Sequence, residues 1–354
     1  MNRRQFITTT GAALALTPAI VNGQAAAPRI RIGQIGTRHA HAAGKLAAIR
    51  NLPELYELVG IVEPDEKRRA ALAKDKSYQD VAWLTEEQLL NTKGLQVVDV
   101  ETEVKDLVPT GTRCVAAGLH IHLDKPAGES LPAFKHLLDE ATKRRRTVQM
   151  GYMFRYNPAF QLCYRAVKEG WLGNVFAIDT CMGKVLDARS RAELVPYRGG
   201  SIFELGCHVI DSVVKLLGRP ERVTAHGRSS GNYTDGFLDN QLAVLDYPRA
   251  TVTVRSAMIE VEGGLRRQFV VCGDKGTLDI RPLEPPKARL ALDQPRENYK
   301  KGYQDVAFPN PPRYDAEFID LARVVRGEKQ FEWSPEHDLA VHETILLASG
   351  LKTT

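Results

Sequence analysis

The sequence predicts an α/β protein in which a doubly wound parallel sheet precedes an α+β domain with an open, mostly antiparallel sheet. The chain has 354 residues, which is enough for two domains with separate cores. Strand-like and helical segments alternate from residue 29 to 151, as is typical of a parallel sheet. After residue 151, several short strands follow one another, which favours antiparallel pairing. We therefore expect domains at residues 28–150 and 151–354.

The spacing of apolar residues predicts the elements of the first half. Short, mostly apolar runs indicate five strands, at residues 29–35, 56–62, 97–101, 120–123 and 147–151. Helical periodicity predicts helices between them, at residues 39–51, 66–74, 108–117 and 131–143.

The second half has a different order of elements. Helices are expected at residues 158–169, 202–217, 315–326 and 335–349. Strands are expected at residues 175–181, 222–225, 241–245, 251–258, 268–271 and 277–280. The segment 283–312 holds six of the 19 prolines and is predicted to be irregular.

Composition excludes several classes of protein. A hydrophobic fraction of 43% without low-complexity blocks excludes a disordered chain. The net charge of +5 is too weak and too scattered to indicate a nucleic-acid partner. The five cysteines stand far apart, so that neither a disulfide framework nor a zinc site is expected, and we expect no metal.

The first 27 residues are predicted to be an export signal. Arg3 and Arg4 are followed by Gln, Phe and Ile, and then by an uncharged run that ends in three alanines. This pattern resembles a twin-arginine signal, and its apolar part is too short to span a membrane. We therefore expect an exported, periplasmic protein.

The turn after the first strand is a candidate phosphate-binding loop. It contains Gly36, but Arg38 and His41 occupy the positions where a GxGxxG motif has its later glycines, so a plain strand-to-helix turn remains an alternative. Glu63 ends the second strand, where a carboxylate accepts hydrogen bonds from the ribose hydroxyls of NAD. Arg38 could bind pyrophosphate or the extra phosphate of NADP. NAD is favoured, and NADP remains possible.

Three later segments carry residues suited to catalysis. Lys125 follows the strand at 120–123 within Asp-Lys-Pro, at the ligand-binding edge of the sheet. Residues 155–158 read Arg-Tyr-Asn-Pro, and Glu204 and His208 lie four residues apart in a predicted helix. Ser201-x-x-Glu204 also fits a capping box, a structural role for the same glutamate.

Together these segments resemble the glucose–fructose oxidoreductase/inositol dehydrogenase (Gfo/Idh/MocA) superfamily, whose first domain has a Rossmann fold. The resemblance implies hydride transfer between a sugar or polyol carbon and a nicotinamide, with Lys125, His208 and Glu204 as the catalytic residues. It implies cofactor contacts from Gly36, Thr37, Arg38, His39, Glu63, Thr102 and Lys125. Candidate substrate contacts are Arg155, Tyr156, Asn157, Lys184, Tyr197 and Arg198. The family's Thr-Pro-Asn-x-x-His loop is replaced here by residues 102–107.

The resemblance and the export signal together imply an oxidoreductase with tightly bound, recycled NAD that acts on a sugar, glycoside or polyol. Relatives that cleave glycosides by transient oxidation and elimination suggest a second interpretation, an NAD-dependent glycoside hydrolase. A third is a non-catalytic sugar- or cofactor-binding protein, which the altered loops favour. The family also implies a homo-oligomer, either a dimer or a tetramer.

Overall fold

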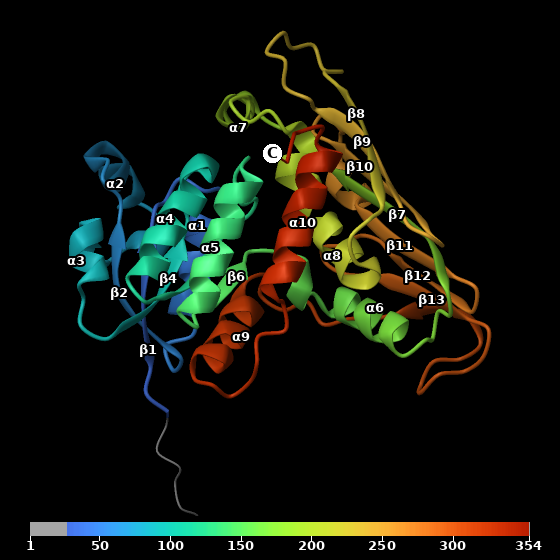
Figure 1. Cartoon of the computed structure of the whole chain (residues 1–354), viewed down its shortest axis with the longest axis horizontal. Helices are drawn as coiled ribbons and strands as arrows, with labels where there is room; N and C mark the ends of the chain where they lie inside the picture. Colours follow the sequence, from blue (N-terminus) through green and yellow to red (C-terminus); the bar gives the residue numbers. More distant parts are fainter. Residues whose placement is uncertain (1–26, 354) are drawn as a thin grey trace, which may run out of the picture.

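The computed structural model describes residues 27–353, which form two sheets with helices packed on them (Figure 1). The first sheet belongs to the N-terminal half and the second to the C-terminal half, so the predicted fold class is confirmed. The predicted export signal lies outside the described residues, except for Ala27. Among residues 27–353, the helices are too short or too polar to cross a membrane.

The first sheet is parallel throughout, in the order β3-β2-β1-β4-β5-β6. The chain order reverses between β1 and β4, so the ligand-binding crevice is expected at the carboxyl ends of these strands. The strands are β1 (Ile30–Ile35), β2 (Tyr56–Val62), β3 (Trp83–Leu84), β4 (Leu95–Val100), β5 (His120–Leu123) and β6 (Val148–Met150).

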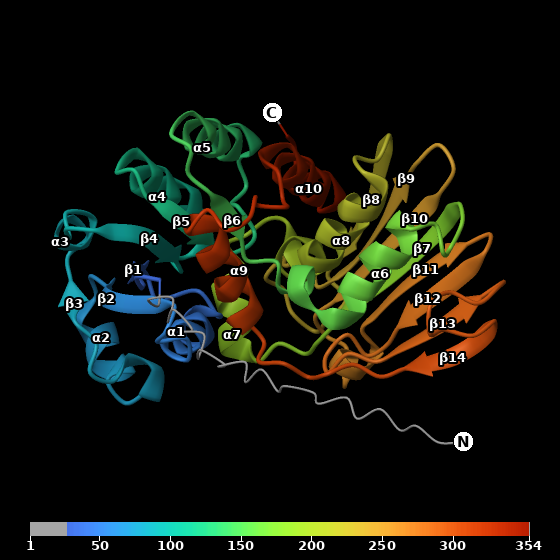
Figure 2. The same cartoon turned by 90° about the horizontal axis from the view of Figure 1, so that it is seen from below.

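Helices cover both faces of this sheet. In Figure 2, α4 (Val104–Ala116) and α5 (Leu131–Lys143) lie on one face, and α1 (Ala42–Arg50) and α2 (Glu66–Leu72) on the other. The helix predicted from residue 39 begins only at Ala42, which leaves residues 39–41 in the turn next to the cleft. The helix predicted from residue 108 begins at Val104 instead. A short helix, α3 (Glu86–Leu90), and strand β3 were not predicted.

The second sheet has eight strands in the order β14-β13-β12-β11-β7-β10-β9-β8. β7 and β10 pair in parallel, and the other neighbours are antiparallel. The strands are β7 (Val175–Gly183), β8 (Arg222–Arg228), β9 (Asn240–Asp246), β10 (Thr251–Ala257), β11 (Gln268–Gly273), β12 (Gly276–Ile280), β13 (Ala288–Leu292) and β14 (Gly302–Val306).

Two of these strands correct the sequence analysis, which predicted an irregular segment at residues 283–312. β13 alternates buried and less buried residues and pairs with β12 along its length. β14 then forms the outer edge, where its polar residues remain accessible to water. The prolines of this segment lie outside both strands, so they do not interrupt the ladder.

The helices of the second half connect the two domains. α6 (Pro158–Lys168) and α8 (Cys207–Leu217) pack under the second sheet, whereas α10 (Pro335–Ala348) lies between α8 and α5 of the first domain (Figure 1). α9 (Asp315–Val325) packs beside α1, where the Tyr56 hydroxyl donates a 2.6 Å hydrogen bond to the carbonyl of Phe318. α9 therefore completes the N-terminal domain, although its sequence lies in the predicted second domain.

Candidate active site

A cleft of about 730 Å³ opens between the two domains, next to the turn that follows β1. Its walls come from that turn, the start of α4, the segment after β5 and the loop that contains α7 (Ala188–Leu194). Of the predicted site residues it contains five: Arg38, His39, Tyr197, Arg198 and Glu204. The position agrees with the crevice expected from the strand order.

Gly36 makes a close approach of backbone to backbone possible at the base of this cleft. Its φ of +90° lies in the region that favours glycine. A Cβ atom at this position would lie 2.6 Å from the backbone nitrogen of Thr102. Thr102 itself directs its hydroxyl to the carbonyl of Glu103 at 3.1 Å. The predicted loop is thus built around one glycine, and its turn fits the tight bend that a dinucleotide needs.

Two arginines reach the outer end of the cleft. Arg38 pairs with Asp65 at 2.9 Å, and Arg68 donates a 2.6 Å hydrogen bond to the Thr37 hydroxyl. Both guanidinium groups line the cleft, where they could bind phosphate oxygens. Sequence analysis missed Arg68, because a charged residue on an amphipathic helix gives no signal of its own.

Glu63 lies behind these groups. It is 2% exposed, its carboxylate accepts a hydrogen bond from the Thr37 hydroxyl, and its other oxygen accepts from the backbone of Asp65 at 3.1 Å. The structure therefore places Glu63 where it orients Thr37 and Arg68, and not on the cleft wall as predicted. Its direct contact with a ribose stays a prediction.

Lys125 and Glu204 form a buried ion pair at the inner end of the cleft. The Lys125 ammonium lies 3.1 Å from Oε1 of Glu204 and donates a 2.7 Å hydrogen bond to the same residue's carbonyl. Lys125 has three N–H donors, of which Glu204 takes two. Among residues 27–353 the third has no acceptor, although Lys125 itself is 1% exposed and lies behind Glu204, which lines the cleft.

The pair keeps both side chains charged. Burial alone would lower the pKa of Lys125, but the negative groups around it, Glu204 first and Asp124 among the others, together outweigh burial and the pKa is raised. Burial alone would raise the pKa of Glu204, but Lys125, then Lys184 and the nearby histidines together outweigh burial and the pKa is lowered. Lys125 is therefore a preorganised cation at the end of the cleft.

Glu204 lies in a π-helical turn, η3 (Ile202–Gly206), that leads into α8. The alternative capping box is not formed, because Ser201 directs its hydroxyl to the carbonyl of Ser256 at 3.0 Å. The backbone nitrogen of Ile202 donates to Gln241 at 2.8 Å instead. Such turns are frequent at functional sites, and here the turn directs both acceptors of Glu204 toward Lys125.

His208 lies one turn further on, in a mostly apolar environment. It is 4% exposed, and its ring centroid lies 5.7 Å from that of Phe154 and 6.3 Å from that of His41. Burial, followed by the charge of Lys125, holds the pKa of His208 well below its usual value. The imidazole is therefore neutral at pH 7, the form that accepts a proton.

The Arg-Tyr-Asn segment, whose substrate contacts stay a prediction, lies outside the lining of the cleft. Arg155 is fully buried and pairs with Asp211 on α8 at 2.7 Å and with Asp338 on α10. Tyr156 donates a 3.0 Å hydrogen bond to Asp320, and Asn157 caps α6. The structure does not bring these three side chains to the cleft. Their polar groups are instead engaged in ion pairs and hydrogen bonds within the protein.

The other predicted substrate contacts lie closer to the site. Lys184 is partly buried, and its pKa is lowered by burial although Glu204 opposes the shift. Tyr197 and Arg198 line the cleft, and Arg198 pairs with Glu129 at 3.1 Å. Lys184 and Glu204 both belong to the second domain, and each influences the pKa of the other.

The fold and this cleft define a two-domain, dinucleotide-dependent oxidoreductase. Residues 30–152 match the model of an oxidoreductase family with an NAD-binding Rossmann fold, and residues 160–279 match the GFO/IDH/MocA C-terminal domain. The chain belongs to the GFO/IDH/MocA family, and it is an NAD(P)-dependent oxidoreductase.

The similarity to individual relatives is distant. The chain is 24% identical to inositol 2-dehydrogenase 1 of Saccharopolyspora erythraea over 71% of this chain and 74% of that protein. It is also 24% identical to trans-1,2-dihydrobenzene-1,2-diol dehydrogenase of Sus scrofa, over 67% and 69%. The structure of an aldose-aldose oxidoreductase from Caulobacter crescentus has a TM-score of 0.76 at 18% identity, and the match covers 91% and 98% of the two chains. That last likeness supports the fold.

Proposed function

We propose that this protein oxidises a secondary hydroxyl of a sugar, glycoside or polyol and that it works outside the cytoplasm with a tightly bound, recycled NAD(P). The observation that carries the proposal is the charged Lys125–Glu204 pair at the inner end of the cleft, with neutral His208 one helical turn away. Relatives named as inositol and aldose oxidoreductases support a polyhydroxylated substrate.

The residues of the chain divide the work of alcohol oxidation. NAD(P)⁺, which cleft residues such as Arg38 and Arg68 would hold, would supply the acceptor for the hydride of the substrate carbon. Lys125 donates its third N–H to the substrate oxygen and stabilises the negative charge that develops there. His208 accepts the hydroxyl proton, for which its neutral form is required. Glu204 keeps Lys125 charged and in position.

Variants of the two principal residues test this proposal. We expect Lys125→Met and His208→Ala to lower the rate at which polyols and sugars reduce the bound NAD(P)⁺ by about 10²–10⁴-fold. Lys135→Met provides the control, because Lys135 is an exposed lysine on α5. Unchanged turnover in both active-site variants would refute the assignment.

The products separate this proposal from transient-oxidation glycoside cleavage. A ketone or lactone, formed together with reduced cofactor or a reduced second sugar, supports the oxidoreductase. A released aglycone without net oxidation supports the glycoside hydrolase instead.

Export is tested on the full-length chain. We expect Arg3→Lys combined with Arg4→Lys to retain the protein in the cytoplasm, whereas the wild-type chain reaches the periplasm. Equal periplasmic amounts of both chains would contradict a twin-arginine signal.

A further inference from the structure

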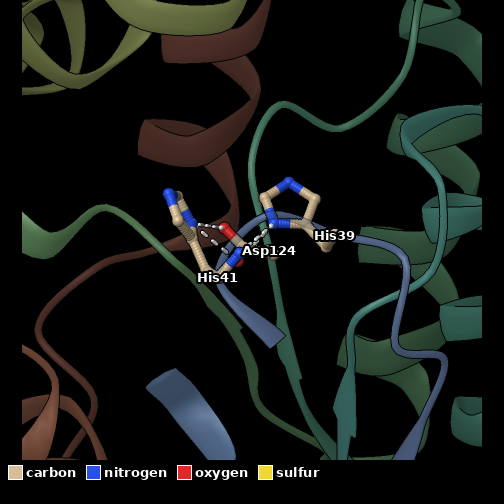
Figure 3. A group of neighbouring side chains, drawn as sticks. All are labelled: His39, His41 and Asp124. Atoms are coloured by element: carbon tan, nitrogen blue, oxygen red, sulfur yellow. Dashed lines mark hydrogen bonds and ion pairs between the residues drawn. The ribbon is translucent and has the colours of Figure 1, made fainter. Parts of the chain in front are cut away.

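Two histidines converge on one carboxylate beside Lys125. His39 and His41 lie in the turn between β1 and α1, and Asp124 follows β5 (Figure 3). Nδ1 of His39 is 3.0 Å from Oδ2 of Asp124, and Nδ1 of His41 is 2.9 Å from the same oxygen. Asp124 is fully buried, and the His41 side chain is 15% exposed.

The hydrogen bonds of His39 fix which of its nitrogens carries a proton. Nε2 lies 3.0 Å from the carbonyl oxygen of Lys125, which can only accept, so Nε2 carries the hydrogen. Nδ1 lies 3.3 Å from the backbone nitrogen of His41, whose N–H donates to it. In this neutral form, the Nδ1 lone pair faces the Asp124 carboxylate at 3.0 Å, an unfavourable contact that either a second proton on His39 or a cation between the two groups relieves.

A second carboxylate points to the same requirement. Glu101 is fully buried, and neither of its oxygens has a hydrogen-bond partner among residues 27–353. Its Oε2 lies 3.6 Å from Nδ1 of His39. A buried carboxylate without a donor is costly, and a nearby positive ion offsets that cost.

Two other groups of acidic and histidine side chains each contact a Lys or Arg side chain. His122 lies 3.1 Å from Asp99 and 2.9 Å from Glu317, and the Lys45 ammonium lies 3.1 Å from Nε2 of His122. In the other group, Arg155 holds Asp211 and Asp338. Of the three groups with metal-ligand spacing in the described chain, only the group at Asp124 faces no Lys or Arg side chain at hydrogen-bonding distance.

We propose that His39, His41 and Asp124 form a binding site for a divalent transition metal ion, with Zn²⁺ as the ion that fits. Two imidazole nitrogens and a carboxylate are ligands that zinc accepts, and three protein ligands leave one position open. Ligands about 2.0–2.1 Å from zinc lie about 3.3 Å apart, so the observed spacing needs only a small outward movement. The bond from His39 to the Lys125 carbonyl is the outer contact that orients a metal-bound histidine.

This proposal goes beyond the oxidoreductase function and does not depend on it. The sequence analysis expected no metal because it searched for closely spaced cysteines. Here the ligands lie 83 residues apart in the chain and meet only because β1 and β5 end at the same edge of the sheet.

Zinc binding to chelator-treated protein, without cofactor or substrate, tests the proposal. We expect titration calorimetry with ZnCl₂ to give one ion per chain, and His41→Ala and Asp124→Asn to weaken binding by more than about 100-fold, because even loss of an outer contact costs about 10–100-fold. Two matched controls retain the affinity: His226→Ala, at an exposed histidine on β8, and His337→Ala, in the group held by Arg155.

Cobalt gives an independent readout if Asp124→Asn fails to fold. We expect the Co²⁺-loaded wild-type protein to show the visible absorption of a nitrogen- and oxygen-ligated ion, and folded His41→Ala to lack it. The proposal is overturned if the wild-type protein takes up no zinc at millimolar concentration, or if His41→Ala binds zinc as tightly as His337→Ala.

Discussion

Glu204 holds Lys125 in its charged form at a place where burial alone would favour the neutral amine. Both residues were selected through their family motifs, and helical spacing placed Glu204 on the same face as His208. The structure pairs Glu204 with Lys125 instead. Helical spacing shows which neighbours share a face, but it does not reveal the distant segment that packs against that face.

Replacing Glu204 by glutamine tests how this pair works. We expect Glu204→Gln to lower the pKa of Lys125, because burial is then opposed without the carboxylate that raises this pKa most. If catalysis needs the ammonium form of Lys125, kcat/KM of the variant should decline with rising pH at a lower pH than kcat/KM of the wild-type protein. If Glu204 had only a structural role, the variant would be less active, but the pH at which kcat/KM declines would not change.

Arg155 shows the limit of motif reasoning at the residue scale. The Arg-Tyr-Asn-Pro motif was recognisable, but a motif does not reveal whether its side chains point to a ligand or into the core. The buried aspartates that account for Arg155 lie 56 and 183 residues further along the chain.

At the scale of elements, Arg155 joins the segment before α6 to α8 and α10. We expect Arg155→Met to lower the free energy of unfolding by about 3–5 kcal/mol, because Asp211 and Asp338 lose their buried partner. Denaturant unfolding measures this. Arg165→Met, at an exposed arginine on α6, is the control. If the Arg155→Met protein had normal stability but a raised KM, this result would support the predicted contact between Arg155 and the substrate.

The turn after β1 offers a second test at this scale. We expect Gly36→Ala to abolish tight cofactor binding, because the added Cβ would lie 2.6 Å from the backbone of Thr102. Gly118→Ala is matched to it, with a φ of +86° and no atom within 4 Å of the added Cβ. Gly118→Ala should lower the free energy of unfolding by about 1–2 kcal/mol, because alanine is strained in the left-handed backbone conformation, and it should leave cofactor binding unchanged. Equal cofactor affinity in the two variants, measured by calorimetry, would contradict a close-approach role for Gly36.

Alternating strands and helices were predictable in the N-terminal half because each has a clear apolar period. β13 and β14 were not, because the prolines between and around them dominate the local pattern. Their pairing depends on β12, which lies earlier in the chain and provides the ladder.

At the scale of the whole molecule, the chain returns to its first domain near the end. Lys45 on α1 pairs with Glu317 on α9 at 2.6 Å, and both side chains are fully buried. No local pattern predicts a contact across 272 residues. This contact and the position of α10 fix how the second domain faces the cofactor domain.

Buried histidines make stability depend on pH across the molecule. Burial lowers the pKa of His342 to about 3, from an ordinary value of 6.5. The unfolded chain therefore binds more protons, so the free energy of unfolding falls as pH drops from 6.5 toward 3. We expect His342→Leu to reduce this slope by up to about 1.4 kcal/mol per pH unit. His226→Leu should leave the slope, measured by denaturant unfolding at several pH values, unchanged.

We propose that this cleft holds NAD(P) tightly despite a phosphate loop with a single glycine at its turn. The most direct measurement is the absorbance and mass spectrum of whatever the freshly purified protein releases on denaturation. We predict about one NAD(P) or NAD(P)H per chain. Protein that releases no nucleotide and binds neither added NAD nor added NADP would contradict the claim.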